Sequence, residues 1–293
     1  MTKQKMDSLS VSIILPAKNE EKGLVVILPK LKQLYPDAEI IVVNDGSSDN
    51  TQNICDQFSV KVVKHPYSIG NGAAVKSGAR VASGDILVFM DADGQHNPED
   101  VGRMIAKYRE GYDMVVGARH SNSQANLGRS YANRIYNWLA SWMVGKKIDD
   151  LTSGLRLATA AKFKEFLHLL PNGFSYPTTI TMSFFRAGYP VAYLPIHASS
   201  RQGKSHISPL HDGVKFLLII FRVGTLYSPL KIFFPISLTF FTTGLGYYVY
   251  TYLTEHRFTN MSGLLFTTSV LVFLIGLVSE QVTSLLYSRN DQN

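Results

Sequence analysis

The chain has one cysteine, Cys55, and two tryptophans among its 293 residues. A single cysteine cannot form an internal disulfide. Cys55 lies in a helical pattern, where a cysteine is more often a small packing residue than a nucleophile. The first ten residues lack the apolar core of a secretory signal, so they give no indication of secretion.

Charged residues are scarce as well, and they are absent from two long stretches near the C-terminus. Lys231 and Glu255 enclose 23 uncharged residues, and Arg257 and Glu280 enclose 22. A membrane-spanning helix needs about 20 mostly apolar residues. A buried core helix is the alternative for one such run, but two in tandem favour a multi-pass integral membrane protein. The expected two-helix domain covers 230–293, with spans at about 231–254 and 260–285.

The segment between the two spans is too short to form a domain, so both large ends should lie on the same side of the membrane. The N-terminal part carries most of the basic residues, including Lys204, Arg222 and Lys231 close to the first span. The positive-inside rule puts this part on the cytoplasmic face. The formal charge of +7 would also suit nucleic acid. Beside two spans it fits anionic lipid and anionic substrates better, so we expect no nucleic-acid partner.

The first 200 residues alternate short β-rich runs with helical patterns. This alternation predicts an α/β domain, assigned to 1–207, in which helices cover both faces of a mostly parallel sheet. Apolar residues at helical spacing then predict an interfacial amphipathic helix over 208–229, with a helix packed under the domain as the alternative. The expected strands are Val11–Leu15, Glu39–Val43, Val60–Val63, Ile86–Met90, Asp113–Gly117 and Tyr189–Ile196. The expected helices are Glu20–Tyr35, Thr51–Phe58, Gly72–Ala82, Glu99–Glu110, Asn126–Val144, Lys162–Leu170 and Thr178–Ala187, with a polar turn at Asp149–Arg156.

Two carboxylates leave the end of the most apolar strand together, as Asp91-Ala92-Asp93, with Gln95 two residues on. Hard divalent cations prefer oxygen ligands, and Mg²⁺ commonly takes one or two carboxylates together with substrate phosphates. Ligands of open α/β sheets bind outside the carboxyl ends of the strands. A solvated acidic turn is the alternative for a bare D-x-D. The context favours a site for Mg²⁺ or Mn²⁺ with a diphosphate, formed by Asp91, Asp93 and Gln95.

Other polar motifs follow the neighbouring strands. Pro16-Ala17-Lys18-Asn19-Glu20 follows the first strand, and Asn44-Asp45-Gly46-Ser47-Ser48-Asp49 follows the second. An aspartate at such a position can accept hydrogen bonds from a nucleoside, although the same residues are common in structural turns. Gly70-Asn71-Gly72 opens the next helix and would let a ligand approach the backbone, but alone it is a weak signal.

Taken together and in this order, P-A-K-N-E, V-V-N-D-G-S-S-D-N-T, G-N-G-A-A, F-M-D-A-D-G-Q-H and V-V-G-A-R resemble glycosyltransferase family 2. The resemblance covers about residues 10 to 205 and implies the Rossmann-like nucleotide-diphospho-sugar transferase fold, called GT-A. Three motifs and the two spans resemble the dolichol-phosphate mannose synthase and polyprenyl-phosphate glycosyltransferase branch more closely. These motifs are Gly117-Ala118-Arg119, Asp150-Leu151-Thr152-Ser153-Gly154-Leu155-Arg156 and Arg201-Gln202-Gly203-Lys204-Ser205. Asn44, Ala118, Leu155 and His206 depart from residues common in the branch.

The resemblance, together with the need for cations between two anionic groups, gives the expected roles. Asp93, Arg119, Arg129 and Arg201 are the expected catalytic residues. Arg119 and Arg129 would hold an acceptor phosphate through bidentate guanidinium contacts, with Arg134 as a weaker candidate that could equally be a solvated helix face. Arg201 and Lys204 would close over the diphosphate, although such residues could instead bind lipid headgroups. The expected nucleotide-sugar contacts are Pro16, Ala17, Asn19, Glu20, Asp45, Gly70, Gly72, Asp91, Ala92, Ser153, Gly154, Lys204 and Ser205.

The implied reaction is inverting transfer of one sugar from a UDP- or GDP-sugar to polyprenyl (dolichyl or undecaprenyl) phosphate at the membrane. The acceptor phosphate is largely a dianion at pH 7, because its second pKa is near 6, and it needs no general base. A processive polysaccharide synthase is one alternative, but Trp138 and Trp142 lie in no Q-x-x-R-W motif. A non-catalytic lipid-binding scaffold is the other. The spans contain no G-x-x-x-G pattern, which leaves the oligomeric state open, and a homo-oligomer packed through the spans is compatible with the sequence.

Overall fold

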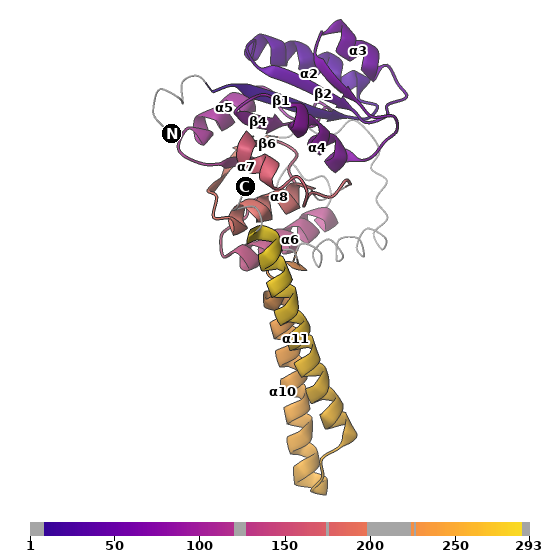
Figure 1. Ribbon diagram of the computed structural model, residues 1–293, viewed down its shortest axis with the longest axis vertical. Coiled ribbons are helices and arrows are strands. Elements are labelled where there is room, and N and C mark those ends of the chain that lie inside the picture. Colours follow the sequence, from indigo (N-terminus) through magenta and orange to yellow (C-terminus); the bar gives the residue numbers. More distant parts are fainter. Residues whose placement is uncertain (1–8, 120–126, 174–175, 198–223, 226, 289–293) are drawn as a thin grey trace. The chain divides into compact units, whose positions relative to one another are not determined.

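The computed structural model describes residues 9–119, 127–173, 176–197, 224–225 and 227–288 (Figure 1). The chain divides into two compact units, Met1–His206 and Ile207–Asn293. Most of the predicted interfacial helix 208–229 lies outside the described residues, so that element stays a prediction.

The first unit contains a seven-stranded sheet with the order β3-β2-β1-β4-β6-β5-β7. β1 to β4 run parallel to one another, and β5 pairs in parallel with β7. β6 is antiparallel to both of its neighbours, β4 and β5. The α/β fold predicted from the sequence is confirmed. The strands are β1 (Val11–Ala17), β2 (Glu39–Asn44), β3 (Lys61–Lys64), β4 (Ile86–Phe89), β5 (Met114–Arg119), β6 (Arg156–Thr159) and β7 (Val191–Ile196).

β6 is not predicted by the sequence, in which residues 149–156 read as a polar turn with no strand after it. The four residues of β6 are too few to show a clear period, and Arg156 at its start looks polar. In the structure Arg156 is fully buried, because the strand lies between two others in the middle of the sheet. The consequence is that the polar residues preceding β6 lie beside the carboxyl end of β4.

The helices pack apolar stripes against this sheet. α2 shows the pattern most clearly, because Leu24, Ile27, Leu28 and Leu31 recur every three or four residues and are all buried. They join strand residues such as Ile13 and Val88 in the main hydrophobic cluster. The helices of this unit are α2 (Glu21–Leu34), α3 (Thr51–Gln57), α4 (Asn71–Val81), α5 (Glu99–Tyr108), α6 (Leu127–Val144), α7 (Ala160–Glu165) and α8 (Tyr176–Arg186).

The second unit is a hairpin of two long helices, α10 (Pro229–Glu255) and α11 (Asn260–Ser288) (Figure 1). Both are long and apolar enough to cross a membrane. Ser237 and Ser269 exchange hydrogen bonds between the helices, the hydroxyl of each donating to the backbone carbonyl of the other at 2.9 and 3.0 Å. α11 continues past Glu280, whose carboxylate accepts a bond from the Leu230 backbone N–H in the first turn of α10. This contact explains how a charged residue is accommodated within the second helix.

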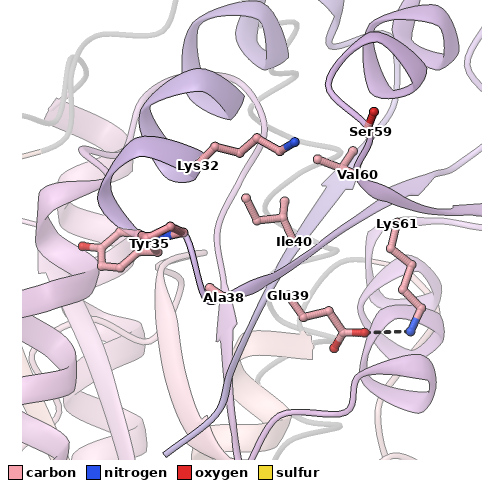
Figure 2. Close-up of a pocket in the computed structure, with 9 residues that line it drawn as sticks. Lys32, Tyr35, Ala38, Glu39, Ile40, Ser59, Val60 and Lys61 are labelled. Carbon is pink, nitrogen blue, oxygen red and sulfur yellow. Dashed lines mark hydrogen bonds and ion pairs between the residues drawn. The ribbon is translucent and has the colours of Figure 1, made fainter.

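The amino edge of the sheet is held by the partly buried carboxylate of Glu39. Its oxygens accept hydrogen bonds from the Ser12 hydroxyl and from the backbone and hydroxyl of Ser83, and it pairs with Lys61 Nζ at 2.7 Å. Figure 2 shows this pair at the rim of a small pocket between α2 and the starts of β2 and β3. Burial alone would raise the pKa of Glu39, but these hydrogen bonds, led by the one from Lys61, lower it to about 2. This pocket lies at the opposite edge of the sheet from the Asp91–Asp93 motif.

Glu39→Gln should therefore remove a pH-dependent contribution to stability. Because the pKa of Glu39 is lowered in the folded chain, its contribution is complete above its unfolded pKa of about 4.3 and is lost as pH falls toward 2. We expect a loss of about 1 kcal/mol, or about 2–4 °C in Tm, at pH 7. The difference in Tm between wild type and variant should shrink progressively as pH falls from about 5 to about 2. Asp37→Asn removes an exposed charge two residues away and serves as the control. A difference that is constant with pH would contradict the assignment.

Candidate functional site

The Asp91–Asp93 loop begins one residue after the end of β4, at the carboxyl edge of the sheet. Ala92 is buried, while Asp91 and Asp93 are partly exposed. A Cβ atom on Gly23 of α2 would overlap the Ala92 carbonyl, so the loop rests directly on the backbone of that helix. Asp93 in turn accepts a hydrogen bond from the backbone N–H of Gln95 at 3.1 Å. The loop backbone is therefore fixed, and the two carboxylates lie at its accessible side.

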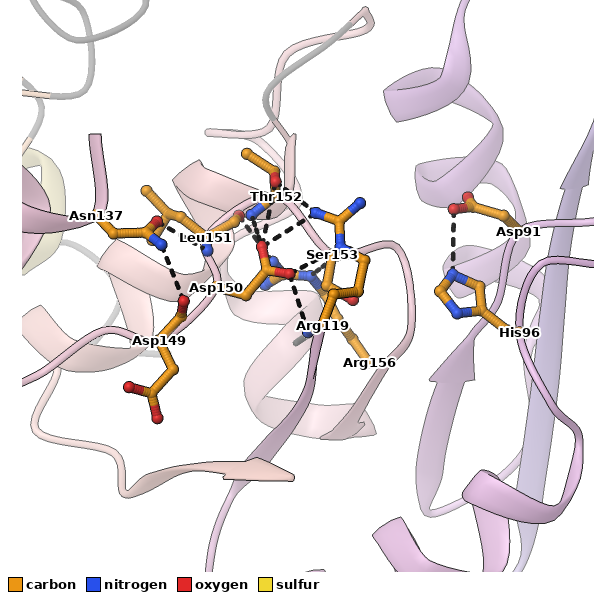
Figure 3. A network of polar contacts seen from close by, with 10 residues as sticks. All are labelled: Asp91, His96, Arg119, Asn137, Asp149, Asp150, Leu151, Thr152, Ser153 and Arg156. Atoms are coloured by element: carbon orange, nitrogen blue, oxygen red, sulfur yellow. Dashed lines mark hydrogen bonds and ion pairs between the residues drawn. The ribbon is translucent and has the colours of Figure 1, made fainter. Parts of the chain in front are cut away.

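Asp91 lies between two residues from different segments. The Nε2 atom of His96 is 3.5 Å from Asp91 Oδ2, and Figure 3 shows the imidazole facing the carboxylate. On another side Gly154 lies so close that a Cβ atom there would overlap the Asp91 carboxylate. Glycine is required at position 154 by this close approach. The sequence predicts that Gly154 contacts nucleotide-sugar; the structure shows its contact with Asp91.

The donor atoms at this loop fit a hard divalent cation. Asp91 and Asp93 supply carboxylate oxygens and Gln95 supplies an amide oxygen, the ligand type that Mg²⁺ and Mn²⁺ prefer. Across the part of the chain that the structure describes, no group of three or more His, Cys, Asp or Glu side chains has the arrangement of a metal site. A cation at the Asp91–Asp93 loop would therefore need oxygens from a substrate phosphate or from water. Such sharing is how Mg²⁺ usually binds together with phosphates.

Arg119 ends β5 and is held by Asp150 (Figure 3). Arg119 Nε donates to Asp150 Oδ2 at 2.8 Å, and Nη2 donates to Asp150 Oδ1 at 3.1 Å and to the Thr152 hydroxyl at 2.6 Å. Burial alone would raise the pKa of Asp150, but the hydrogen bonds and charge of Arg119 lower it. Burial alone would lower the pKa of Arg119, but Asp150, with a smaller contribution from Asp91, raises it. Both groups of this pair are thus charged.

Arg156 fixes the segment that carries Asp150 and Gly154. Its side chain is completely buried, and it donates to the backbone carbonyls of Leu151 and Ser153 at 2.9 and 2.8 Å. It also donates to the Thr181 hydroxyl of α8. The pKa of Arg156 is lowered by this burial. Asp150 and Arg156 belong to the motif D-L-T-S-G-L-R, but the sequence assigns them no role. The pairing of Asp150 with Arg119, 31 positions earlier, is not visible in residue spacing.

The motifs after β1 and β2 are joined by hydrogen bonds. Asn19 Oδ1 accepts from the backbone N–H of Ser48, and the Asn19 N–H donates to the Ser47 hydroxyl. The Glu20 N–H donates to the Thr51 hydroxyl. The parallel register brings Ala17 opposite Asn44, which explains why the two motifs meet. The side-chain amide of Asn44 donates to Gln52 through Nδ2 and accepts from the Ser47 backbone N–H through Oδ1. A carboxylate at this position could accept but not donate.

Asp45 is buried, and both of its carboxylate oxygens have hydrogen-bond partners. Its two oxygens accept from the Ser68 hydroxyl and from the backbone N–H groups of Ile69 and Gly70, and His65 Nδ1 lies 2.7 Å from Oδ1. Burial alone would raise the pKa of Asp45, and these hydrogen bonds, led by that of His65, lower it. Four donors occupy the acceptor positions of one carboxylate. In this structure Asp45 orders the loop at 68–70, and a contact with a nucleoside stays a prediction.

The backbone of residues 171–173 packs directly against Gly70 and Gly72. Cβ atoms at these positions would overlap the backbone of residues 171–173, and the Ala73 N–H donates to the Asn172 carbonyl at 2.8 Å. The sequence predicts that these glycines let a ligand approach the backbone. In the structure the loop at 171–173 makes that close approach instead. Lys76 of α4 donates to the carbonyl of Leu170 and to the side chain of Asn172, which holds the loop in place.

The remaining predicted residues are only partly described. Arg134 is exposed on α6. Arg129 lies in the same helix, but its side chain is outside the described residues, as are Arg201, Lys204 and Ser205 altogether. Pro16, Ala17, Asn19 and Glu20 lie at the carboxyl end of β1, and Ser153 is completely buried beside Gly154.

Comparison with known families gives two matches that together span most of the chain. Residues 12–167 match the model of Glycosyl transferase family 2, and residues 228–285 match that of the GtrB C-terminal hairpin. The first match covers more than half of the chain and includes β2 to β6 and all of β1 but its first residue.

Two relatives found by sequence similarity have the same name. An undecaprenyl-phosphate 4-deoxy-4-formamido-L-arabinose transferase of Photorhabdus laumondii is 34% identical over 156 residues, covering 50% of this chain and 48% of the relative. The protein of that name from Pseudomonas fluorescens is 30% identical over 220 residues, covering 68% and 61%. The chain thus matches between about half and three fifths of the length of these relatives.

Solved structures support the fold. Glucosyl-3-phosphoglycerate synthase of Mycobacterium tuberculosis, solved in complex with Mn²⁺, UDP-glucose and phosphoglyceric acid, has a TM-score of 0.61 and 20% identity, covering 75% of this chain and 80% of that one. Its complex with Mn²⁺, UDP and glucosyl-3-phosphoglycerate gives 0.60 and 21%, covering 75% and 81%. At this level of identity the likeness shows a shared fold and nothing about ligands.

Proposed function

The chain belongs to glycosyl transferase family 2, and on that premise we propose that it transfers a single sugar from a nucleoside-diphosphate sugar to a polyprenyl phosphate at the membrane. The observation that carries the proposal is the placement of Asp91 and Asp93 at the carboxyl end of β4, with Arg119 at the end of β5. One segment contacts both, because Gly154 lies against Asp91 and Asp150 pairs with Arg119. Such an edge is where open α/β sheets bind ligands. It combines acidic oxygens for a cation with a basic group for a second anion.

The acceptor proposal rests on the names of the relatives and on the C-terminal hairpin. The relatives are named for undecaprenyl phosphate, and the apolar helices α10 and α11 suit an enzyme whose acceptor has its tail in the bilayer. Anchoring both reactants at one surface raises their effective concentration. The same helices support an integral membrane protein, and the distribution of basic residues supports a cytoplasmic catalytic unit.

The chemistry is governed by repulsion between two anions. The acceptor is a phosphate dianion, and the leaving group is a nucleoside diphosphate. In our proposal Asp91, Asp93 and Gln95 hold Mg²⁺ or Mn²⁺, which when bound offsets the charge that develops on the departing diphosphate. Arg119 and Arg129 bind the acceptor phosphate, with Arg134 at the edge, and Arg201 and Lys204 lie against the diphosphate. Direct attack by a phosphate oxygen on the anomeric carbon inverts its configuration.

The outer face of α6 suits contact with lipid headgroups. Trp138 is 67% exposed and Trp142 is 44% exposed, one helical turn apart, while Tyr136, Ala140 and Met143 are buried on the other face. Exposed tryptophan of this kind is enriched where proteins meet the membrane interface. Arg134 is exposed one turn before Trp138, and Lys146 and Lys147 are exposed just beyond the helix. Basic residues at that level attract anionic lipid.

Transfer activity provides the direct test of the proposed function. The full-length protein in lipid nanodiscs should convert polyprenyl phosphate to a lipid carrying one sugar when it is given UDP- and GDP-sugars in turn with Mn²⁺ or Mg²⁺. Asp93→Ala should lower the rate by about 100-fold or more, because one carboxylate ligand is lost. The exposed variant Asp37→Ala is the control. Mass spectrometry of the product decides between outcomes: a polymer would indicate a processive synthase, and nucleotide-sugar binding without any product would indicate a non-catalytic scaffold.

Gly154→Ala should impair the same site through a single methyl group. The added Cβ would overlap the Asp91 carboxylate and displace it. We expect the Mn²⁺ concentration needed for half-maximal transfer to rise about 10-fold, in the range found for residues that support metal ligands. Gly173→Ala is the matched control, because no atom lies within 4 Å of its added methyl group. Equal metal dependence in the two variants would contradict the contact between Gly154 and Asp91.

Tryptophan fluorescence tests the membrane contact of α6. Trp138 and Trp142 are the only tryptophans in the chain, so no replacement of others is needed. In nanodiscs that contain lipids brominated near the headgroup, we expect quenching of at least about half of the emission, because interfacial tryptophan lies at that depth. Emission equal to that in unbrominated nanodiscs would show that this face is not at the membrane. Trp142→Phe and Trp138→Phe separate the two contributions.

A further inference from the structure

Asp150 engages Arg119 along one defined edge of the guanidinium group. Nε and Nη2 of Arg119 donate to the two oxygens of Asp150, and Nη2 donates also to the Thr152 hydroxyl. These bonds use the Nε hydrogen and both hydrogens of Nη2, leaving the two of Nη1. Among the residues that the structure describes, none accepts a hydrogen bond from Nη1. The pair therefore fixes the plane of the guanidinium and determines which of its edges is presented to a ligand.

Asp150 is itself held in place before any ligand binds. Its Oδ1 accepts from the backbone N–H of Thr152 at 2.9 Å and its Oδ2 from the backbone N–H of Arg119 at 3.3 Å. The Asp150 side chain is 7% exposed, against 27% for Arg119. The backbone on either side of Thr152 is held by Arg156 through the carbonyls of Leu151 and Ser153. A carboxylate with this many fixed contacts has little freedom to turn away from Arg119.

The segment that carries Asp150 also supports the other half of the site. Gly154, four residues on, lies against the Asp91 carboxylate. The segment 150–154, held by hydrogen bonds from Arg156, thus contacts both the Asp91–Asp93 loop and Arg119. Displacement of Asp150 would alter the position of Arg119 relative to Asp91, even though Asp150 touches neither a cation nor a phosphate.

We propose that Asp150 is a positioning residue that orients Arg119 so that its Nη1 edge receives the acceptor phosphate. This inference rests on the proposed function. The alternative is that Asp150 competes with the acceptor phosphate for Arg119 and releases Arg119 when the phosphate binds. The two arrangements give opposite signs in one measurement: loss of a positioning residue weakens acceptor binding, whereas loss of a competitor strengthens it.

The experiment measures steady-state transfer by the full-length protein in nanodiscs, with polyprenyl phosphate and nucleotide-sugar varied separately. Asp150→Ala should raise KM for polyprenyl phosphate or lower kcat so that kcat/KM falls about 10- to 100-fold. KM for nucleotide-sugar should change less than about 2-fold. Asp150→Asn keeps the shape and one acceptor oxygen, so it should recover part of the loss. Asp149→Ala is the matched control, because this neighbouring carboxylate pairs with Lys147 at the surface.

A double-mutant cycle separates positioning from a general structural role. If Asp150 acts through Arg119, Asp150→Ala should have no further effect in an Arg119→Ala background, whereas independent roles would give additive losses. Asp150→Asn in the same background provides the cycle should the alanine variant fail to fold.

Four outcomes would overturn the positioning role: a lower KM for polyprenyl phosphate, an unchanged kcat/KM, additivity in the cycle, or an equal rise in both KM values. Absence of transfer by the wild-type protein would instead refute the proposed function itself, which keeps the two failures distinct.

Discussion

The close approach of Gly154 to the Asp91 carboxylate is the constraint on which the rest of the site depends. It requires that the segment 150–156 be delivered to the carboxyl end of β4, and the antiparallel insertion of β6 between β4 and β5 does this. The same segment then places Asp150 against Arg119, the last residue of β5. Buried Arg156 secures the segment by donating to carbonyl oxygens. Within the part of the chain that the structure describes it has no direct ion pair, so hydrogen bonds stabilise its charge.

Charge separation within the site follows from this arrangement. Asp91 and Asp93 present negative charge on one side, while Arg119 is balanced by Asp150 and is therefore nearly neutral as a pair. Fixed dipoles and charges that need no reorganisation are the most effective means of stabilising a developing anion. The Arg119–Asp150 pair thus supplies directed N–H donors more than net positive charge. The additional positive charge for two phosphate groups would have to come from the cation and from Arg129, Arg201 and Lys204.

Much of the fold was accessible from the sequence, because it depends on local patterns. The buried strands, the stripe of α2 and the order of motifs at strand ends predicted an α/β fold of the right family, and the two uncharged runs predicted both long C-terminal helices. β6 was not accessible, because four residues beginning with a buried arginine carry no period. The contacts of Gly154, Gly70 and Gly72 were also missed, since a sequence shows that glycine permits a close approach but not which group approaches. The ion pair of Asp150 joins residues 31 positions apart and needed the tertiary structure.

The central claim is that Asp91 and Asp93 hold a divalent cation together with a nucleoside diphosphate. Electron paramagnetic resonance of Mn²⁺ tests it most directly, because bound Mn²⁺ loses the sharp six-line signal of the free ion. Full-length protein titrated with Mn²⁺ should bind about one ion in the presence of UDP or GDP, and Asp91→Asn should abolish that binding. Undiminished binding of Mn²⁺ and nucleoside diphosphate by Asp91→Asn would contradict the account.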